Sequence, residues 1–280
     1  FIMKKVKFFD SRVRDKFSKH ISAISTLASV LLIFFNIPEN KKIILFAVFS
    51  ACLFLLYCKI WWHFNNLQEI ELDVEGSKVS IKTGDLFLQP GLKCIAFNEY
   101  FDTKVDEKII SSTSLNGQYI NKFFPNSVNE LDKIITEYEF EEEEKIGINN
   151  ERRVGKKVKY SLGTTCVIDD YLLTAFSHFD KNNKAYLSMP DYLSFLITFW
   201  DKVNKVYAQR NVSVPIFGSG ITRIKEHKNI SDEELLKIML WTFRISEMRF
   251  KYPAKLSIII NYDKIKTINL LDIKSARNGI

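Results

Sequence analysis

Residues 216–223 read Ile-Phe-Gly-Ser-Gly-Ile-Thr-Arg and follow an apolar run, residues 212–215, that has the length of a buried strand. Gly218 and Gly220 carry no Cβ, so the main-chain N–H groups of this loop can approach a bound group closely. Concave clusters of N–H groups bind phosphate. Because Gly-x-Gly also occurs in plain turns, the loop predicts a phosphate site only in combination with other loops at strand ends.

The chain after residue 67 alternates between strand-like and helical patterns. Apolar or alternating runs predict strands at residues 70–72, 78–82, 92–97, 160–168, 171–176, 212–217 and 255–260. Helical spacing predicts helices at residues 127–139, 190–209 and 232–249. This alternation is typical of an α/β fold with a layered sheet, in which ligands bind beyond the carboxyl ends of the strands.

Polar or glycine-containing loops lie at several of these strand ends, and residues 112–117 are expected to form another polar loop. We expect the loops to converge on one pocket because strand ends of a layered sheet share an edge. The candidate binding residues are Asp85, Leu86, Asn98, Glu99, Asp102, Ser114, Leu115, Asn116, Gly117, Gly218, Ser219, Gly220, Ile221, Thr222, Arg223, Asn261 and Tyr262.

Patterns for catalysis or metal binding are weak. The four cysteines form no Cys-x-x-Cys pair and have no histidine cluster near them, so we expect buried thiols, no disulfide framework and no metal site. No resident cofactor is expected. His178 and Asp180 could form a catalytic pair, but no serine or cysteine nucleophile is identified beside them. A structural role is therefore expected for His178.

Two long uncharged runs, residues 21–38 and 43–58, lie near the N-terminus. A bilayer-spanning helix needs about 20 mostly apolar residues. With the polar turn between them, the runs predict a transmembrane helical hairpin over residues 20–63, with helices at residues 20–37 and 43–62. A buried hairpin of a soluble core is the alternative, since hydroxyl side chains make the first run less apolar. A cleaved signal peptide fits poorly because a second span follows at once.

Seven basic residues lie within residues 1–19, opposed only by Asp10 and Asp15. The positive-inside rule therefore predicts a cytoplasmic N-terminus, and two crossings return residues 67–280 to the cytoplasm. A nucleic-acid-binding N-terminus is an alternative use of this charge. No strand interleaves aromatic and basic residues, so no nucleic-acid partner is expected.

Several stretches together resemble a macro domain: Gly84-Asp85-Leu86, the run ending in Asn98, the Gly218-Ser219-Gly220-Ile221 loop, and the run ending in Tyr262-Asp263. Macro domains bind ADP-ribose and related nucleotides, and the resemblance implies a three-layer α/β fold with a mixed sheet. Residues 95–102 and 215–223, together with the hairpin, resemble the membrane-anchored ThsA effectors of type II Thoeris antiphage defence. This resemblance covers nearly the whole chain.

The resemblance implies roles for individual residues. Asp85 would accept a hydrogen bond from the adenine amino group, with a turn or helix cap as the alternative, and Tyr262 would pack on adenine, with a place at the sheet edge as the alternative. Gly218, Ser219, Gly220, Ile221 and Thr222 would hold the diphosphate, Arg223 would add charge, and Ser114, Leu115, Asn116 and Gly117 would form a second phosphate loop. Asn98, Glu99 and Asp102 would contact a group attached to the distal ribose.

The resemblance also implies a partner and an output. A TIR-domain protein would make an ADP-ribose-derived signal, expected to be histidine–ADP-ribose, whose binding would assemble a homo-oligomer, expected to be a tetramer, in the bacterial inner membrane. Disruption of the lipid bilayer would then cause cell death or growth arrest, an abortive infection. Hydrolytic macro domains carry an Asn-Ala-Ala-Asn motif, whereas this chain reads Ala96-Phe97-Asn98-Glu99, so catalysis is not expected. A membrane-tethered ADP-ribosyl hydrolase is the alternative.

Overall fold

A computed structural model describes residues 5–220, 223–224 and 229–276. Its contacts divide the chain into two compact units. The hairpin unit contains residues 5–68 and also residues 266–275, and the pocket unit contains residues 69–265. The sequence placed all residues from 67 onward in one domain; the structure instead groups the last helix with the hairpin.

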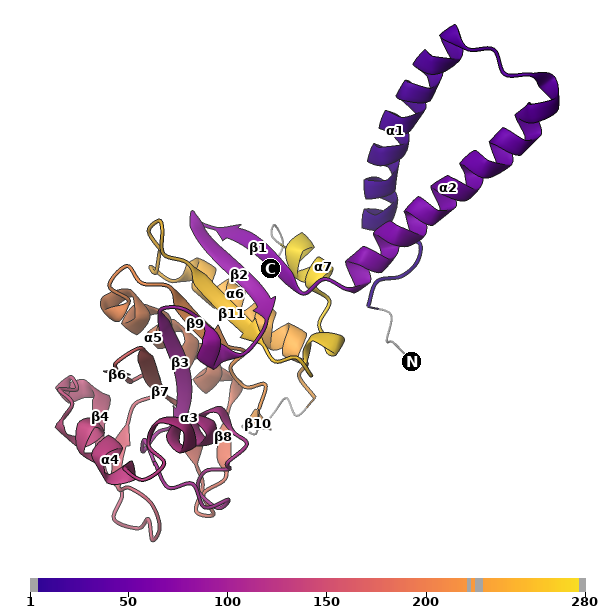
Figure 1. The fold of residues 1–280 in the computed structure, drawn as a ribbon. Coiled ribbons are helices and arrows are strands. Elements are labelled where there is room, and N and C mark those ends of the chain that lie inside the picture. The colour runs from indigo at the N-terminus through magenta and orange to yellow at the C-terminus, as the bar shows by residue number, and fades with distance from the viewer. Residues whose placement is uncertain (1–4, 221–222, 225–228, 277–280) are drawn as a thin grey trace. The chain divides into compact units, whose positions relative to one another are not determined.

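Two long helices form most of the hairpin unit, α1 (Ser11–Phe34) and α2 (Glu39–Asn65) (Figure 1). The Asp10 side chain caps α1 by accepting the N–H of Arg12, so this helix begins within the stretch that the sequence assigned to a separate basic segment. Pro38 stands at the N-cap of α2, where its missing N–H costs no helical hydrogen bond.

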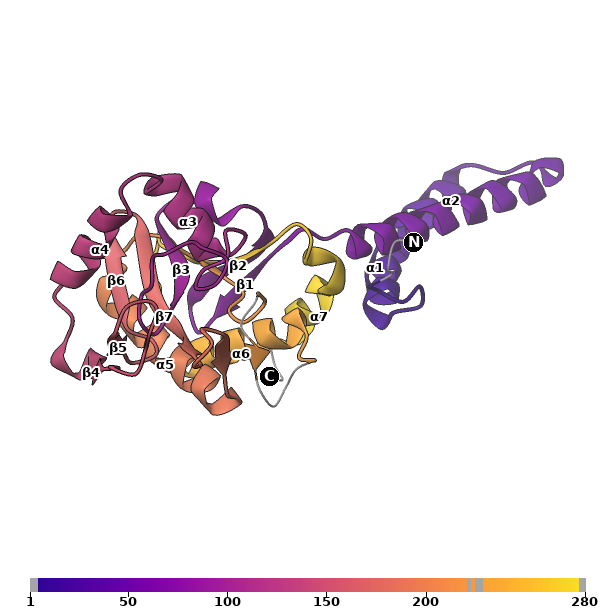
Figure 2. The ribbon, with the colours of Figure 1, turned by 90° about the horizontal axis from the view of Figure 1, so that it is seen from below.

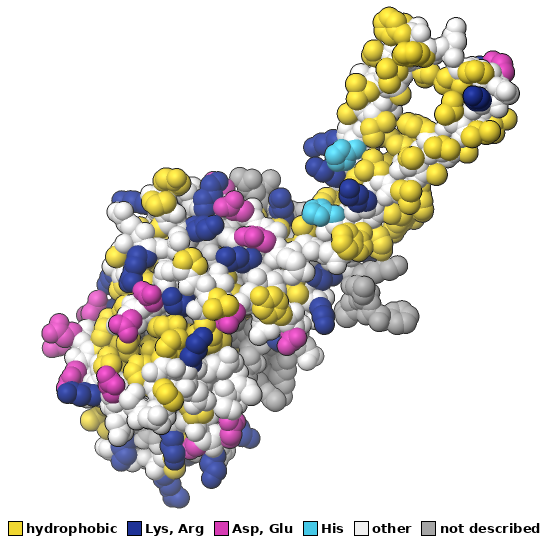
Figure 3. Space-filling model, in the orientation of Figure 1, with side chains coloured by type: hydrophobic (Ala, Val, Ile, Leu, Met, Phe, Trp, Pro, Cys, Tyr) yellow, Lys and Arg dark blue, Asp and Glu magenta, His cyan; other side chains and the backbone are white. Residues whose placement is uncertain are grey.

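The apolar side chains of these helices are largely uncovered within the structure. Both helices are long and apolar enough to cross a membrane, and no residue of the most apolar stretch of α1 is buried. Ile33 and Ile43, near the turn, are 77% and 81% exposed. In Figure 3, hydrophobic side chains cover much of the visible hairpin, while basic and histidine side chains gather toward one end.

A small core closes the base of the hairpin. Val6, Val13, Tyr57, Ile60 and Leu271 are buried together, and Leu271 belongs to the short C-terminal helix α7 (Leu270–Ser275). The Tyr57 hydroxyl donates to the carbonyl of Phe8, and the Trp61 indole donates to that of Val6 at 3.0 Å. These contacts hold the two helices and α7 in one unit.

A mixed sheet runs through the pocket unit. In the described part of the chain, its strand order is β1-β2-β11-β9-β3-β7-β8-β10, with β6 paired to β7. The pairs from β2 through β11, β9 and β3 to β7 are parallel, as is β8 with β10, whereas β1, β6 and β8 pair antiparallel with β2, β7 and β7. The strands are β1 (Glu69–Val74), β2 (Ser77–Thr83), β3 (Leu92–Asn98), β6 (Thr165–Ile168), β7 (Tyr171–Phe179), β8 (Ala185–Leu187), β9 (Val212–Pro215), β10 (Arg223–Ile224) and β11 (Leu256–Ile260).

Helices cover both faces of this sheet, and Figure 2 shows the three layers. One face carries α3 (Leu115–Phe123) and α4 (Val128–Glu137), whose Tyr119 and Leu131 share a core with Phe97 of β3. The other carries α5 (Met189–Val206) and α6 (Asp232–Ile245), joined by the ring contact of Trp200 and Phe243. The predicted three-layer α/β fold with a mixed sheet is confirmed.

Shorter elements complete the pocket unit. A two-stranded ribbon pairs β4 (Lys145–Ile148) with β5 (Val158–Tyr160), and short 3-10 helices form at Leu86–Leu88, Glu142–Glu144 and Ile265–Thr267. The strand predicted over residues 160–168 is divided, because Gly163 has a φ of +90° and a turn joins Thr164 to Ser161. The two halves therefore become β5 and β6, which lie in different sheets.

Candidate functional site

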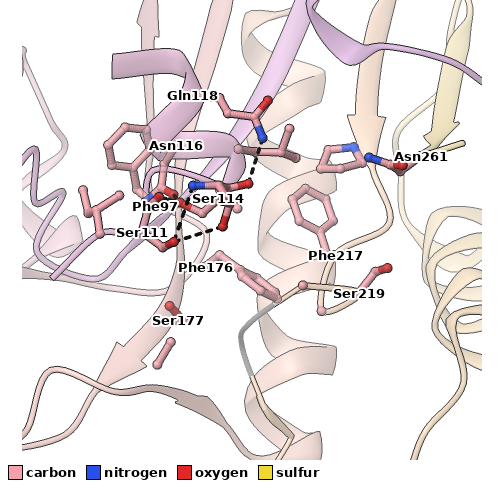
Figure 4. Close-up of a pocket in the computed structure, with 18 of the residues that line it drawn as sticks. Phe97, Ser111, Ser114, Asn116, Gln118, Phe176, Ser177, Phe217, Ser219 and Asn261 are labelled. Atoms are coloured by element: carbon pink, nitrogen blue, oxygen red, sulfur yellow. Dashed lines mark hydrogen bonds between the residues drawn. The ribbon is translucent and has the colours of Figure 1, made fainter. Parts of the chain in front are cut away.

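A pocket of about 1030 Å³ lies at the carboxyl ends of the parallel strands β2, β11, β9, β3 and β7 (Figure 4). Phe97, Phe176 and Phe217 contribute aromatic rings to its wall, and serine and asparagine side chains approach from the surrounding loops. Pockets of this size that combine apolar walls with a few polar groups bind small molecules and cofactors. The structure thus has a pocket at the strand ends where the sequence predicts the site.

The loop after β9 forms one side of the pocket, which Gly218, Ser219 and Gly220 line. Gly218 has a φ of +84°, and the N–H of Ser219 donates to the carbonyl of Ile216 at 3.3 Å. Among the residues that the structure describes, no atom lies within 4 Å of a Cβ built on Gly220, so the described part of the backbone is open there. These features suit a loop that presents main-chain N–H groups to an anion.

A buried tyrosine anchors this loop to α5. The Tyr192 hydroxyl donates to the main-chain carbonyl of Phe217 at 2.9 Å, and burial raises the pKa of Tyr192, so the hydroxyl remains a donor. Ile221 and Thr222 lie outside the described residues. The main chain of Arg223 pairs with Tyr186 in the parallel pairing of β10 with β8.

Asp85 lies where β2 ends, and it both caps a helix and lines the pocket. Its Oδ1 accepts the N–H of Phe87 at 2.8 Å, at the start of the helix Leu86–Leu88. Among the described residues, no protein donor reaches Oδ2 of Asp85, which leaves that oxygen able to accept from a ligand. Leu86, also in the lining, is 4% exposed and anchors the loop in the core.

The end of β11 lies beside the end of β2. The N–H of Gly84 donates to the carbonyl of Ile260 at 3.0 Å, which brings the Asp85 loop next to Asn261 and Tyr262. Asn261 closes its own turn by accepting the N–H of Asp263 at 3.0 Å. Tyr262 is 65% exposed at the pocket, so its ring is available for stacking.

The stretch predicted as a polar loop at residues 112–117 contains the start of α3. Ser114 is the N-cap, and its Oγ accepts the N–H of Gly117 at 3.2 Å. Ser114, Leu115 and Asn116 line the pocket, so free N–H groups of the first helical turn lie near it. Gly117 lies outside the lining: a Cβ there would come within 2.1 Å of the carbonyl oxygen of Ser111, so glycine permits this close packing.

Asn98 is the last residue of β3 and lines the pocket, but its side chain forms hydrogen bonds with the loop that follows. Its Oδ1 accepts the N–H of Tyr100 at 2.9 Å, and its Nδ2 donates to Asp102 at 3.0 Å. These bonds shape the loop and leave only part of the amide for a ligand.

Glu99 and Asp102 were expected to face the ligand, but the structure places both outside the lining residues. The Glu99 carboxylate, with 2% of its side chain exposed, bonds to Nδ1 of His178 and lies 3.3 Å from the Lys159 ammonium. Asp102 pairs with Arg152 at 2.6 Å and accepts the N–H of Lys156. Each carboxylate is thus neutralised by cationic or polar groups from distant parts of the chain.

The suggested pair of His178 and Asp180 does not form. Asp180 instead accepts the N–H groups of Asn182 and Lys184 and closes the turn between β7 and β8. His178 bonds to Glu99 instead. Among the described residues, no group of three His, Cys, Asp or Glu side chains could hold a metal ion.

Several lining residues were not predicted as binding residues. Phe176 and Ser177 follow the rule that strand ends line such sites, but the run was predicted to end at residue 176, and neither residue was singled out. The loop of Glu107 and Lys108 has no sequence signal of its own. Hydrogen bonds from Ser112 hold the pKa of Glu107 below its ordinary value, so this side chain brings a negative charge to the pocket. Lys108, Lys184 and Lys264 bring positive charge.

Comparisons of the sequence with known proteins identify a family. Residues 79–261 match the family described as "Thoeris protein ThsA, Macro domain". The Thoeris protein ThsA of Bacillus amyloliquefaciens (strain Y2) is 36% identical over 283 residues, covering 97% of this chain and 94% of the relative.

Among solved structures, two variants of the Oceanobacillus iheyensis macrodomain give TM-scores of 0.46 and 0.45 at 12% and 13% identity. Each covers 76% of this chain, and the match includes 100% and 95% of the two macrodomain chains.

Proposed function

This chain belongs to the ThsA family of Thoeris antiphage defence proteins and carries its macro domain, and from that premise we propose that it is a membrane effector gated by a nucleotide signal. The ligand we propose is an ADP-ribose derivative, histidine–ADP-ribose, made by a partner TIR-domain protein. The observation that carries the proposal is the pocket itself, whose lining joins the Asp85 turn, the Gly218–Gly220 loop and the start of α3.

The order of strands suggests how such a ligand would lie. Adenine would sit at the adjacent ends of β2 and β11, between Oδ2 of Asp85 and the ring of Tyr262. The diphosphate would lie at the loop after β9, opposite the first turn of α3. The distal ribose and its attached group would then reach the ends of β3 and β7, near Asn98 and Ser177.

We propose that the pocket senses its ligand without turning it over. The amide of Asn98 is not basic and is hydrogen-bonded to Tyr100 and Asp102, and His178 does not belong to the pocket lining, so neither side chain is placed to act as a general base on a ligand there. Hydrolysis of ADP-ribosylated protein or ADP-ribose esters that Asn98→Ala abolishes would favour the alternative, a tethered hydrolase.

We propose that the hairpin is the part of the protein that acts on the membrane. Exposed apolar side chains on both helices suit a bilayer. The rings of Phe17 and Tyr57 contact each other at the base of the hairpin, with their centroids 5.2 Å apart. Lys16, Lys19 and Lys59 lie within one turn of that contact in sequence, which suits the cytoplasmic membrane surface and predicts that both termini are cytoplasmic. We therefore place the protein in the bacterial inner membrane, where it would damage the bilayer and stop the infected cell.

We propose that gating proceeds through a homo-oligomer, with four copies as the expected state. A shift from about 1% to 99% active needs roughly 5.5 kcal/mol of differential binding. Several linked sites supply such a difference more readily than one site. The mass of the complex in detergent, measured with and without histidine–ADP-ribose, tests this step, and an unchanged mass would contradict it.

Calorimetry of the full chain in detergent against ADP-ribose, histidine–ADP-ribose and cyclic ADP-ribose isomers tests the ligand. We expect the tightest binding for histidine–ADP-ribose. Asp85→Asn retains the cap oxygen for Phe87 but presents an amide, and we expect at least tenfold weaker binding, equal to about 1.4 kcal/mol. Asp169→Asn, an exposed position outside the pocket lining, is the control that should bind as the wild type does. Equal affinities for both variants would contradict the proposed adenine contact.

A further inference from the structure

The C-terminal segment connects the pocket to the hairpin unit over a short stretch of chain. Residues Asn261, Tyr262, Asp263 and Lys264 line the pocket. Residues 266–275, which follow directly, group with the hairpin. The segment therefore begins at the ligand site and ends within the membrane unit.

This segment is a continuous series of turns. The carbonyl of Asn261 accepts the N–H groups of Lys264 and Ile265, and the short helix Ile265–Thr267 follows. Asn269 then orders the start of α7, because its Oδ1 accepts the N–H of Leu271 at 3.1 Å. No glycine or proline occurs between residues 261 and 275, so the sequence contains no flexible break. A change in the Asn261 turn would thus be carried along to α7.

The helix α7 is held on the hairpin base by both charge and burial. The Arg12 guanidinium lies 2.6 Å from the Asp272 carboxylate and donates to Oγ of Ser275 at 3.0 Å. Leu271 is 7% exposed within the core of Val6, Val13, Tyr57 and Ile60. The Asn269 side chain also donates to the carbonyl of Lys5 at 3.2 Å.

We propose that α7 is a clasp that restrains the hairpin, and that occupation of the pocket releases it through the Asn261–Lys264 turn. The clasp joins both ends of the hairpin base, since it holds residues before α1 and residues near the end of α2. Helices that rearrange in a membrane must exchange their packing partners. A docked α7 opposes that exchange, whereas a released α7 permits it. This inference rests on the proposed function and adds the route by which the pocket acts on the hairpin.

Because release of α7 and ligand binding are coupled, the clasp also affects the affinity for the ligand. If the ligand binds better when α7 is released, then weakening the clasp must tighten ligand binding by the same factor. Couplings of this kind usually change an affinity by about 5- to 150-fold. The clasp therefore predicts two effects with a common cause: release of vesicle contents without ligand, and tighter binding.

The test uses the full chain in lipid vesicles that contain a fluorescent dye, with histidine–ADP-ribose as the probe. Arg12→Gln removes the contact with Asp272, and Leu271→Ala empties the apolar contact. Arg14→Gln, an exposed position on the same helix, makes the same chemical change outside the clasp. We expect both clasp variants to release dye without the probe and to bind it at least fivefold more tightly, while wild type and Arg14→Gln release dye only with it.

Clasp variants that match Arg14→Gln in both measurements, or that no longer respond to the probe, overturn the restraining clasp. If Arg12→Gln fails to fold by circular dichroism, Leu271→Ala decides. If wild type neither binds the probe nor releases dye with it, the proposed ligand response is wrong. In that case, probe-independent release by the clasp variants would still support the restraint, and its absence would overturn both.

Discussion

The hydroxyl of Tyr192 donates to the main-chain carbonyl of Phe217 at 2.9 Å, and this bond fixes the loop after β9 to the helix that covers the sheet. Neither residue contributes a charge, yet together they position the turn at Gly218. The ring of Phe217 adds contacts with Phe195 and Phe199 of α5 at 5.0 Å each. The loop that would hold a diphosphate is therefore supported by the core beneath it.

Replacing Tyr192 with phenylalanine should destabilise both the fold and the site. The Phe217 carbonyl would lose its buried donor, at a cost of about 1–3 kcal/mol. Thermal unfolding should shift down by about 2–4 °C for each kcal/mol lost, and calorimetry should show weaker ligand binding. Tyr252→Phe at a position that is 94% exposed is the control, and it should leave both measurements unchanged.

The two glycines of this loop should respond differently to alanine. Gly218 has a φ of +84°, so Gly218→Ala adds a strain of about 1–2 kcal/mol and should lower stability and binding together. Gly220 lacks such a φ, and no described residue lies within 4 Å of a Cβ placed on it, so Gly220→Ala should unfold as wild type does. We expect Gly220→Ala to weaken ADP-ribose binding alone, because the methyl group would occupy the space of the ligand. Unchanged affinity would show that the ligand lies elsewhere.

The buried pair of Asp102 and Arg152 should dominate the stability of the loop behind the pocket. Removing one partner leaves a buried charge, which costs about 3–5 kcal/mol. Arg152→Met should therefore lower the free energy of unfolding in urea by that amount. Arg153→Met changes the adjacent, exposed arginine and should cost little. Similar losses for the two variants would mean that the pair contributes no special stability.

The lowered pKa of Asp106 predicts that the stability of the fold decreases at acidic pH. The N–H groups of Ile109 and Lys108 donate to its carboxylate and hold its pKa below the ordinary value of 3.8. A lowered pKa means that the stabilising contact is complete above pH 3.8 and is lost as the pH falls through the lower pKa of the folded state. The difference in melting temperature between wild type and Asp106→Asn should shrink on acidification in this range. A difference independent of pH would contradict the assignment.

The sequence predicted most strands and the pocket edge because apolar runs followed by polar loops identify the carboxyl ends of buried strands. It misplaced the roles of Glu99 and Asp102 because their partners, His178 and Arg152, lie far along the chain. The packing of α7 on the hairpin could not be predicted from the sequence either, because a six-residue helix has no distinctive sequence pattern. The position of Gly117 in the sequence matched that of a phosphate loop. Its close packing against the backbone of Ser111 could not be predicted, because such packing depends on the three-dimensional arrangement of the two segments.

Release of dye from vesicles that contain the full chain measures whether binding at the pocket acts on the membrane. We expect release when histidine–ADP-ribose is added, none without it, and less release from Asp85→Asn than from wild type at a concentration that saturates wild type but not this variant. Equal release with and without the compound, from a protein that binds it, would contradict a membrane effector gated by a nucleotide.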